Sequence, residues 1–434
     1  MNQLDQVRKA AVKAIENAQD KIIAAGRHLW KIPEPGYREF NTSAFIVNEL
    51  IKLGLEVKTN LAITGFRADI DTGKPGPTLA ILGELDSLII PTHPAADPAT
   101  GAVHACGHNV GGAGLIGSAI ALLAVKNELC GKIALIGTPA EEGIEMSYRK
   151  SLIDSGRIRA IAGKSQLIIE GVFDDVDIVF MNHLGKSYGF WDHNGAINKR
   201  LTFRGKSCHA ARPQGGKNAL NAATLAMNAI ALLRESLGYN DKIRIHGVIT
   251  HGGDAVNVIP DRIDMDYMLR MPHLEEMKKL NDRFDNVVIH AAQAAECEVS
   301  IDTLSGYMPL YDDPALGKIM QQVVKYLDPA AEFEFNPEFL TSSTDMGDIA
   351  TVIPALHGYV PGRSGTGHGV DYAIEDEYSA YVKNAQVAAL MAVELLSGNG
   401  DTGKKIAAGK AALMPIKEYI ETVQKINRTV KSDE

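Results

Sequence analysis

The chain has 434 residues, of which 45% are hydrophobic and 22% charged, and its formal net charge is -9. This length predicts two domains with a cleft between them, because single cores stop growing near about 250–300 residues, and the ordinary composition excludes disordered and fibrous proteins. The acidic balance, without basic stretches interleaved with aromatic residues, argues against nucleic-acid binding. The N-terminus lacks a signal-like apolar segment, and no apolar run reaches about 18 residues, so we expect no membrane span and a cytoplasmic location.

The predicted elements begin with a helix over residues 4–30, where apolar side chains recur at helical spacing before two prolines. Residues 78–82 are then predicted to form a buried strand, residues 110–126 a helix rich in small residues, and residues 132–137 a second strand. Strands that alternate with helices are typical of a largely parallel sheet with both faces covered. The first part of the chain therefore predicts an α/β domain.

The middle of the chain combines strands that alternate apolar and polar residues with two helical patterns. These stretches are residues 201–204, 219–235, 243–250, 262–270 and 274–295. Such alternation indicates an α+β unit with one open sheet face. Because βα character returns after about residue 305, we interpret the middle unit as an insertion. The first domain is therefore predicted to be discontinuous.

Six side chains with acid–base or metal-binding chemistry follow strand-like runs. They are Glu84, Asp86, Glu141, Glu142, His183 and His368. Ligand sites of open parallel sheets form beyond the carboxyl ends of the strands, so we expect these side chains to meet at one edge. Each of them, taken singly, is more often a packed or solvated residue, and their order along the strands is what favours a common site.

The segment His104–Asn109 adds a cysteine, Cys106, between two histidines, His104 and His108. Thiolate, imidazole and carboxylate groups together are ligands of zinc and related divalent metals, and a catalytic site also keeps a position for water. In the pair Glu141–Glu142, one carboxylate can bind the metal while its neighbour carries the proton of the attacking water. The four cysteines have no framework spacing, which favours free thiols in a reducing compartment. The pattern predicts a metal-dependent hydrolase of an amide or similar acyl bond.

Short motifs along nearly the whole chain resemble the amidohydrolase branch of a metallopeptidase family that includes aminoacylases, glutamate carboxypeptidases and indole-acetyl-amino-acid hydrolases. Within that branch the likeness is to amidohydrolases of the p-aminobenzoyl-glutamate hydrolase type. The motifs are Gly83–Leu88, His104–Asn109, Gly137–Gly143, His209–Pro213 with Gly216–Ala219, Gly252–Asp261 and Ser343–Asp348. The resemblance implies a three-layer α/β catalytic domain with a mostly parallel sheet, formed by residues 1–196 and 306–434. It also implies a smaller inserted α+β, ferredoxin-like domain of residues 197–305 that serves as lid and dimer contact.

The resemblance also implies the site residues, with Glu141 as the general base. The implied metal ligands are Cys106, His108, Glu142, His183 and His368. Because the family normally holds two divalent ions, we expect one or two ions of zinc or manganese in each copy of the chain. The roles of His104 and Glu84 stay open, and His104 is interpreted as a residue that supports the ligands.

Three residues of the inserted domain are implied to reach the substrate. His209 would polarise the scissile group across a dimer, and Arg270 with Asn257 would bind a substrate carboxylate, which a guanidinium clamps at two points. The structural alternative for Arg270 is an ion pair with Asp264 or Asp266 on the same strand. We accordingly expect a small, carboxylate-bearing substrate and a homodimer or higher homo-oligomer.

Three functions are consistent with these residues. The first is hydrolysis of the amide of an N-acyl or N-aroyl amino acid, and the second is hydrolytic deamination of a substituted aromatic acid such as a nitroanthranilate. The third is a metal-binding relative without catalytic activity. Release of an amino acid indicates the first function, release of ammonia the second, and metal binding without turnover the third.

Overall fold

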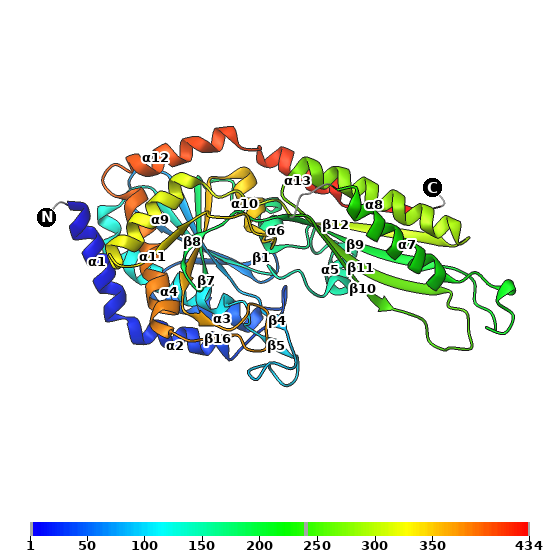
Figure 1. The fold of residues 1–434 in the computed structure, drawn as a ribbon. Helices are drawn as coiled ribbons and strands as arrows, with labels where there is room; N and C mark the ends of the chain where they lie inside the picture. Colours follow the sequence, from blue (N-terminus) through cyan, green and yellow to red (C-terminus); the bar gives the residue numbers. More distant parts are fainter. Residues whose placement is uncertain (1–2, 238–241, 433–434) are drawn as a thin grey trace. The chain divides into compact units, whose positions relative to one another are not determined.

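The computed structural model describes residues 3–237 and 242–432, and Figure 1 labels its helices and many of its strands. The chain divides into two compact units. Unit 1 consists of Met1–Asp192, Tyr311–Glu338 and Asp348–Ile416, and unit 2 of His193–Leu310, Phe339–Gly347 and Lys417–Glu434. The division differs from the predicted boundaries in that Phe339–Gly347 and the C-terminal segment fall into unit 2.

Unit 1 is built on an eight-stranded sheet with the order β1-β2-β6-β3-β7-β14-β8-β13. Its strands are β1 Val57–Leu61, β2 Gly65–Asp71, β3 Thr78–Glu84, β6 Lys132–Thr138, β7 Ile178–Gly185, β8 Tyr188–Phe190, β13 Phe333–Phe335 and β14 Ala355–Pro361. Strands β6, β3, β7 and β14 pair in parallel, as do β8 and β13. Strands β1 and β2 add antiparallel pairs at one end. The mostly parallel sheet confirms the predicted fold class.

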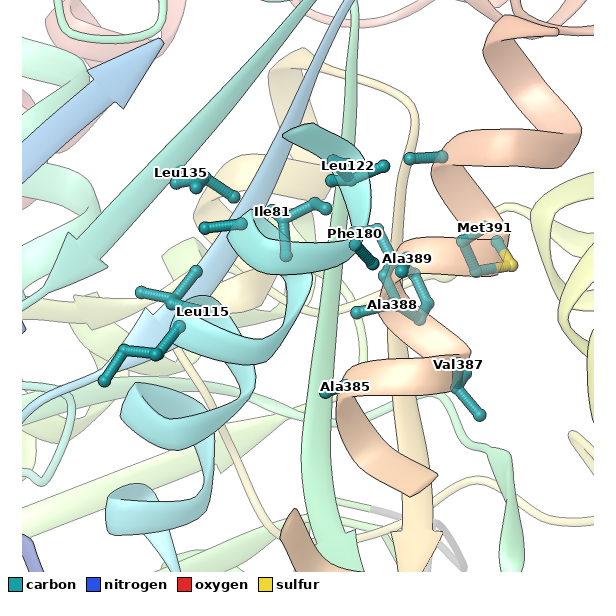
Figure 2. Close-up of a cluster of buried hydrophobic side chains, with 14 of the residues drawn as sticks. Ile81, Leu115, Leu122, Leu135, Phe180, Ala385, Val387, Ala388, Ala389 and Met391 are labelled. Atoms are coloured by element: carbon teal, nitrogen blue, oxygen red, sulfur yellow. The ribbon is translucent and has the colours of Figure 1, made fainter. Parts of the chain in front are cut away.

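Helices of unit 1 pack on this sheet and on one another. They are α1 Gln3–Asn17, α2 Gln19–Trp30, α3 Phe40–Lys52, α4 His108–Val125, α5 Met146–Asp154, α6 Gly163–Ile169, α9 Pro314–Leu327, α10 Met346–Val352, α11 Asn384–Leu396 and α12 Asp401–Ala407. The predicted helix over residues 4–30 is two helices, because the chain leaves the helical conformation at Ala18. Figure 2 shows Leu115 and Leu122 of α4 beside Ile81 and Phe180 of the sheet, with α11 packed alongside.

Helix α4 is the central helix of unit 1 and carries its first residue, His108, to the end of strand β3. It contacts β3, α1, α2 and α11. By length and composition the stretch His108–Glu128 is apolar enough to span a membrane, but 78% of its apolar window is buried inside the protein. A helix that is apolar all round is expected in such a core. Helix and strand approach closely, since a Cβ on Gly83 would lie 2.8 Å from the carbonyl oxygen of Gly111.

Unit 2 is an antiparallel five-stranded sheet with the order β10-β11-β9-β12-β17. Its elements are β9 Gly195–Arg204, α7 Ala219–Glu235, β10 Arg244–His251, β11 Arg262–Met271, α8 Leu274–Ala294, β12 Glu298–Tyr307, α13 Ile416–Ile426 and β17 Arg428–Lys431. Helices α7 and α8 pack against each other and against β9 and β11. The C-terminal strand β17 pairs with β12, so the last residues complete this sheet and do not join that of unit 1.

A buried ion pair joins the sheet of unit 2 to helix α8. The Lys199 ammonium lies 2.5 Å from Asp285 Oδ1 and 2.7 Å from Thr303 Oγ1. The second carboxylate oxygen of Asp285 accepts a hydrogen bond of 2.8 Å from Arg428. Burial lowers the pKa of Lys199 to about 8, although the carboxylate opposes this effect. Both oxygens of Asp285 are therefore occupied by protein cations.

Candidate metal centre

Strand ends and one helix start bring the predicted ligands together in unit 1. Glu84 is the last residue of β3, His183 lies near the end of β7, and the pair Glu141–Glu142 follows the end of β6. These three strands are neighbours that run parallel. Because parallel strands end at one edge of the sheet, the local folding of each strand delivers its side chain to the same place.

Gly107 makes the turn between the candidate ligands Cys106 and His108. Its φ of 92° lies in the left-handed region, and a Cβ there would lie 2.5 Å from the hydroxyl oxygen of Tyr372. Glycine adopts this conformation at little cost, whereas other residues are strained in it. The chain can thereby present the thiol of Cys106 and then start α4 with His108.

The contacts of His108 leave one of its two ring nitrogens available to a cation. Nδ1 lies 3.0 Å from both the carbonyl oxygen and Oδ1 of Asp86, which are acceptors, so this nitrogen carries the proton. Nε2 is buried and has no hydrogen-bond partner within the described part of the chain. Burial alone would lower the pKa of His108, but the charges of Glu84 and Cys106 and the bond to Asp86 raise it well above 6.5. A carboxylate behind one imidazole nitrogen is typical of metal-ligating histidines.

The two ring nitrogens of His183 likewise have different partners. Nδ1 lies 3.1 Å from the carbonyl oxygen of Leu184, and Nε2 lies 3.3 Å from the sulfur of Cys106. Burial lowers the pKa of His183 to about 4, so the ring is neutral at pH 7 and offers a lone pair. Burial also raises the pKa of the Cys106 thiol, so binding of a divalent cation there releases a proton.

Glu142 faces the same space with His368. Its Oε1 is buried, lacks a hydrogen-bond partner among the described residues, and lies 3.5 Å from Nε2 of His368 and 4.0 Å from Nε2 of His108. Burial raises the pKa of Glu142, and the two histidines oppose this effect. A buried carboxylate oxygen that no residue satisfies is costly unless a cation or a proton occupies the space in front of it.

Backbone strain on both sides of the site is held by specific contacts. Ala140 has a φ of 53° and His368 a φ of 63°. The amide of Ala140 donates to the buried carboxylate of Glu39 at 2.7 Å, and Arg149 donates to the carbonyl oxygens of Ala140 and Glu142. The amide of His368 donates to the carbonyl oxygen of Ala105 at 2.9 Å. Such conformations persist where the surroundings fix them, and they often lie at functional sites.

Three groups of side chains in unit 1 place their ligand atoms within 4.8 Å of one another. The groups are Cys106 with His108 and His183, Cys106 with Glu142 and His368, and Glu84 with His108 and Glu141. All five predicted ligands and the predicted base thus lie in one cluster. This donor set suits one or two borderline divalent cations. His104 is buried nearby but belongs to none of these groups, and burial lowers its pKa to about 3.

Several residues at the cluster carried no assigned role in the sequence. Lys164 and Arg149 are fully buried, Lys164 against the carboxylate of Glu84 and Arg149 against the backbone of the loop that carries Glu142. The ring of Tyr359 lies 5.4 Å from that of His183 and 5.1 Å from that of Trp191. Their position is the signal that the sequence offers for the two aromatic residues, because Tyr359 lies near the end of β14 and Trp191 directly follows β8.

The predicted substrate-binding residues of unit 2 form a separate set. His209 and Asn257 are exposed, and the amide of Ala210 donates to the carbonyl oxygen of Asn257 at 2.9 Å, so their loops lie together. Nδ1 of His209 accepts the amide proton of Ala211, which leaves Nε2 as the donor of the neutral ring. Arg270 lies on β11 of this unit.

The aspartates that were the alternative partners of Arg270 pair with other arginines. Asp264 pairs with Arg262, and Asp266 lies 4.0 Å from Arg200. Arg270 itself donates to the sulfur of Met268 and to the carbonyl oxygen of Thr341. Within residues 3–237 and 242–432, no carboxylate forms an ion pair with Arg270.

The chain is similar to known hydrolases over most of its length. Residues 65–394 match the peptidase family M20/M25/M40. The chain is 29% identical to the Xaa-Arg dipeptidase of Mus musculus over 377 residues, which cover 82% of this chain and 80% of the relative. It is 28% identical to a component chain of the p-aminobenzoyl-glutamate hydrolase of Escherichia coli over 313 residues, which cover 68% of this chain and 61% of the relative.

A solved structure shares the fold. It is the Bacillus subtilis YXEP protein, described as a dinuclear metal-binding peptidase of the M20 family, with a TM-score of 0.63 and 21% identity over 88% of this chain and 99% of that one. Fold and site thus define a metal-dependent hydrolase that acts on C–N bonds. The chain belongs to the peptidase family M20/M25/M40, which confirms the family resemblance.

Proposed function

We propose that this enzyme hydrolyses the amide of an N-acyl or N-aroyl amino acid, with Glu141 as the general base. The observation that carries the proposal is the single buried cluster in which the carboxylate of Glu141 lies with His108 and Glu84, beside the other donors. A base must lie within reach of the water whose proton it takes.

The proposed ligands fit one or two zinc or manganese ions. They are Cys106, His108, Glu142, His183 and His368. When bound, a divalent cation supplies Lewis acidity, which polarises the carbonyl oxygen and lowers the pKa of water. The orphaned Oε1 of Glu142 and Nε2 of His108 support this assignment, since each needs a cation or a proton to offset its desolvation.

Glu141 accepts a proton as water attacks the amide carbon and later donates it to the leaving nitrogen. The new C–O bond and the broken C–N bond give a carboxylic acid and a free amine. Next to Glu141, the donation by Arg149 to the carbonyl oxygen of Glu142 fixes the backbone of the pair. Transfer of a proton by a positioned carboxylate contributes about 10²–10⁴-fold to such a rate.

The substrate class rests on the relatives and on polar and aromatic side chains of this chain. An Xaa-Arg dipeptide and p-aminobenzoyl-glutamate share an amide on the nitrogen of an amino acid with a free carboxylate. Arg270 has a guanidinium without a carboxylate partner in the described chain, and with Asn257 it suits that carboxylate. The Nε2 donor of His209 suits the polarised carbonyl. The aromatic ring of Tyr359 beside His183, with Trp191 packed against Tyr359, favours an apolar or aromatic acyl group.

We further propose that unit 1 is the catalytic domain and that unit 2 serves as lid and dimer contact. Strand β10 is an edge strand on which Val248 and Ile249 are 62% and 45% exposed. On α7 of the same unit, Leu225 and Leu232 are 44% and 70% exposed. Exposed apolar edges are covered in stable proteins, and a second copy of the chain is the proposed cover. Four free cysteines support a cytoplasmic location.

The proposal is tested with the purified enzyme loaded with zinc or manganese and offered N-acyl amino acids, N-aroyl amino acids and substituted anthranilates. We expect a free amino acid to be released, and the activity to disappear with a chelator and return with the metal. Release of ammonia alone would identify a deaminase instead. Stable metal binding without turnover of any amide or arylamine would identify a silent relative.

A further inference from the structure

Glu84 holds two different contacts with its two carboxylate oxygens. Oε1 lies 2.6 Å from the ammonium of Lys164, and Oε2 lies 3.3 Å from Nε2 of His108. All three side chains are buried, with 0% of the Lys164 side chain and 4% of the Glu84 side chain exposed. The five expected ligands do not include Glu84, and Lys164 has no role in the proposed reaction.

The facing atoms of Glu84 and His108 are both electron-pair donors. Because Nδ1 of His108 carries the proton directed to Asp86, the neutral ring presents a lone pair at Nε2. Two such acceptors 3.3 Å apart repel each other unless a proton or a metal cation lies between them. Atoms that bind one metal at about 2.0–2.1 Å with tetrahedral angles lie about 3.3–3.4 Å from each other. The observed separation has this value.

We propose that Glu84, through Oε2, is a further ligand of the divalent cation bound by His108, and that Lys164 is the positioning residue that presents this oxygen. The inference deepens the metal site of the proposed function and rests on it. Glu141 belongs to the same group of three side chains, so the cation lies next to the general base.

Lys164 can perform this task because its helix is locked to the loop that carries Glu141. Gly163, which precedes it, is packed so tightly that a Cβ there would collide with the carbonyl oxygen of Pro139. The amide of Gly163 also donates to the carbonyl oxygen of Ala140 at 3.4 Å. A buried ammonium on Oε1 keeps that oxygen from the cation and restricts Glu84 to binding through one oxygen.

The test is a titration of the metal-free full-length enzyme with Co²⁺, without substrate. Affinity is measured by calorimetry, and visible and thiolate-to-cobalt absorption bands report the coordination. We expect Glu84→Gln to weaken the affinity about 100-fold, and Lys164→Met to weaken it about 10-fold with a shift of the visible bands, because neighbours of ligands tune metal affinity about 10–100-fold. Lys199→Met, the same change at a buried lysine of unit 2, is the control and should bind Co²⁺ like the wild type.

The double variant Glu84→Gln with Lys164→Met guards against misfolding, because it removes both buried charges at once. It should fold, as judged by circular dichroism, and bind Co²⁺ as weakly as Glu84→Gln. Affinities of Glu84→Gln or the double variant within about twofold of the wild type, with unchanged bands, would refute ligation by Glu84. An unchanged affinity and spectrum in Lys164→Met alone would refute the positioning role.

The same titration separates this inference from the proposed function. The proposed metal site requires a thiolate-to-cobalt band in the wild type that disappears in Cys106→Ala. If the wild type shows no such band, the metal site of the proposed function is wrong, and the role of Glu84 is wrong with it. If the wild type shows the band and Glu84→Gln keeps it with full affinity, only the inference about Glu84 fails.

Discussion

Each unit of this protein buries a lysine against a carboxylate, and the two pairs differ in what the second carboxylate oxygen meets. In unit 2, Asp285 is bound by Lys199 on one oxygen and by Arg428 on the other. In unit 1, Glu84 is bound by Lys164 on one oxygen and faces His108 with the other. The first pair is saturated by protein cations, whereas the second leaves one coordination position.

The difference shows that buried ion pairs can have different roles in one protein. Removing two charges from water costs several kcal/mol per ion, which the pair regains only when every polar atom is satisfied. The pair of unit 2 meets this condition within the chain and therefore holds a sheet and a helix together. The pair of unit 1 meets it through a proton on His108 or, as we propose, through a metal cation, so its cost is tied to what occupies that position.

The largest expected effect is in unit 1, at the proposed metal site. Glu141→Gln removes the base without changing the size of the side chain, and we expect kcat to fall about 10²–10⁴-fold. Calorimetry should show nearly unchanged metal binding, because Glu141 is proposed to move protons. A variant with full activity would show that another group accepts the proton.

The structural role of the ion pair in unit 2 is tested by removing its carboxylate. Asp285→Asn deprives Lys199 and Arg428 of their shared carboxylate, and breaking a buried pair costs about 3–5 kcal/mol. We expect urea denaturation to show a free energy of unfolding lowered by about 3 kcal/mol, with the Co²⁺ affinity of the folded protein unchanged. A loss of metal affinity of the same size would contradict the separation between the two pairs.

The smallest effect is a pH dependence of stability that comes from Lys199. Its folded pKa of about 8 is below the usual 10.5, so between these values the unfolded chain binds more protons. The free energy of unfolding should therefore rise with pH in this window, by up to about 3 kcal/mol, and this gain should be lost as pH falls through 8. The measurement is the difference between the wild type and Lys199→Met in urea at pH 8 and pH 10.5. A difference that stays constant would contradict the lowered pKa.

Much of the site could be predicted from the sequence because its residues follow a local rule. Glu142 and His183 stand at or just beyond the ends of buried parallel strands, and the apolar runs that mark those strands also fix where they end. Cys106 and His108 precede or begin an apolar helix. The mostly parallel sheet could be inferred in the same way, from strands that alternate with helices.

The rest depends on contacts between distant segments, which leave no local pattern. Lys164 lies in a short helix after a polar stretch, and only its pairing with Glu84, 80 residues earlier, makes it part of the site. Strand β17 looks like a charged tail until it pairs with β12. Arg270 likewise has no carboxylate partner among the described residues because the neighbouring aspartates, Asp264 and Asp266, pair with Arg262 and Arg200.

The close approach of Gly111 to Gly83 fixes the position of helix α4 along its axis, and with it the position of His108 in the metal centre. His108 is the first residue of that helix, and the contact at Gly111 sets how far along its axis the imidazole stands. Inserting one residue between them would move the imidazole by about 1.5 Å and turn it by about 100° away from the other donors. The number of residues in this turn is therefore fixed, and engineered changes here should neither add nor delete residues.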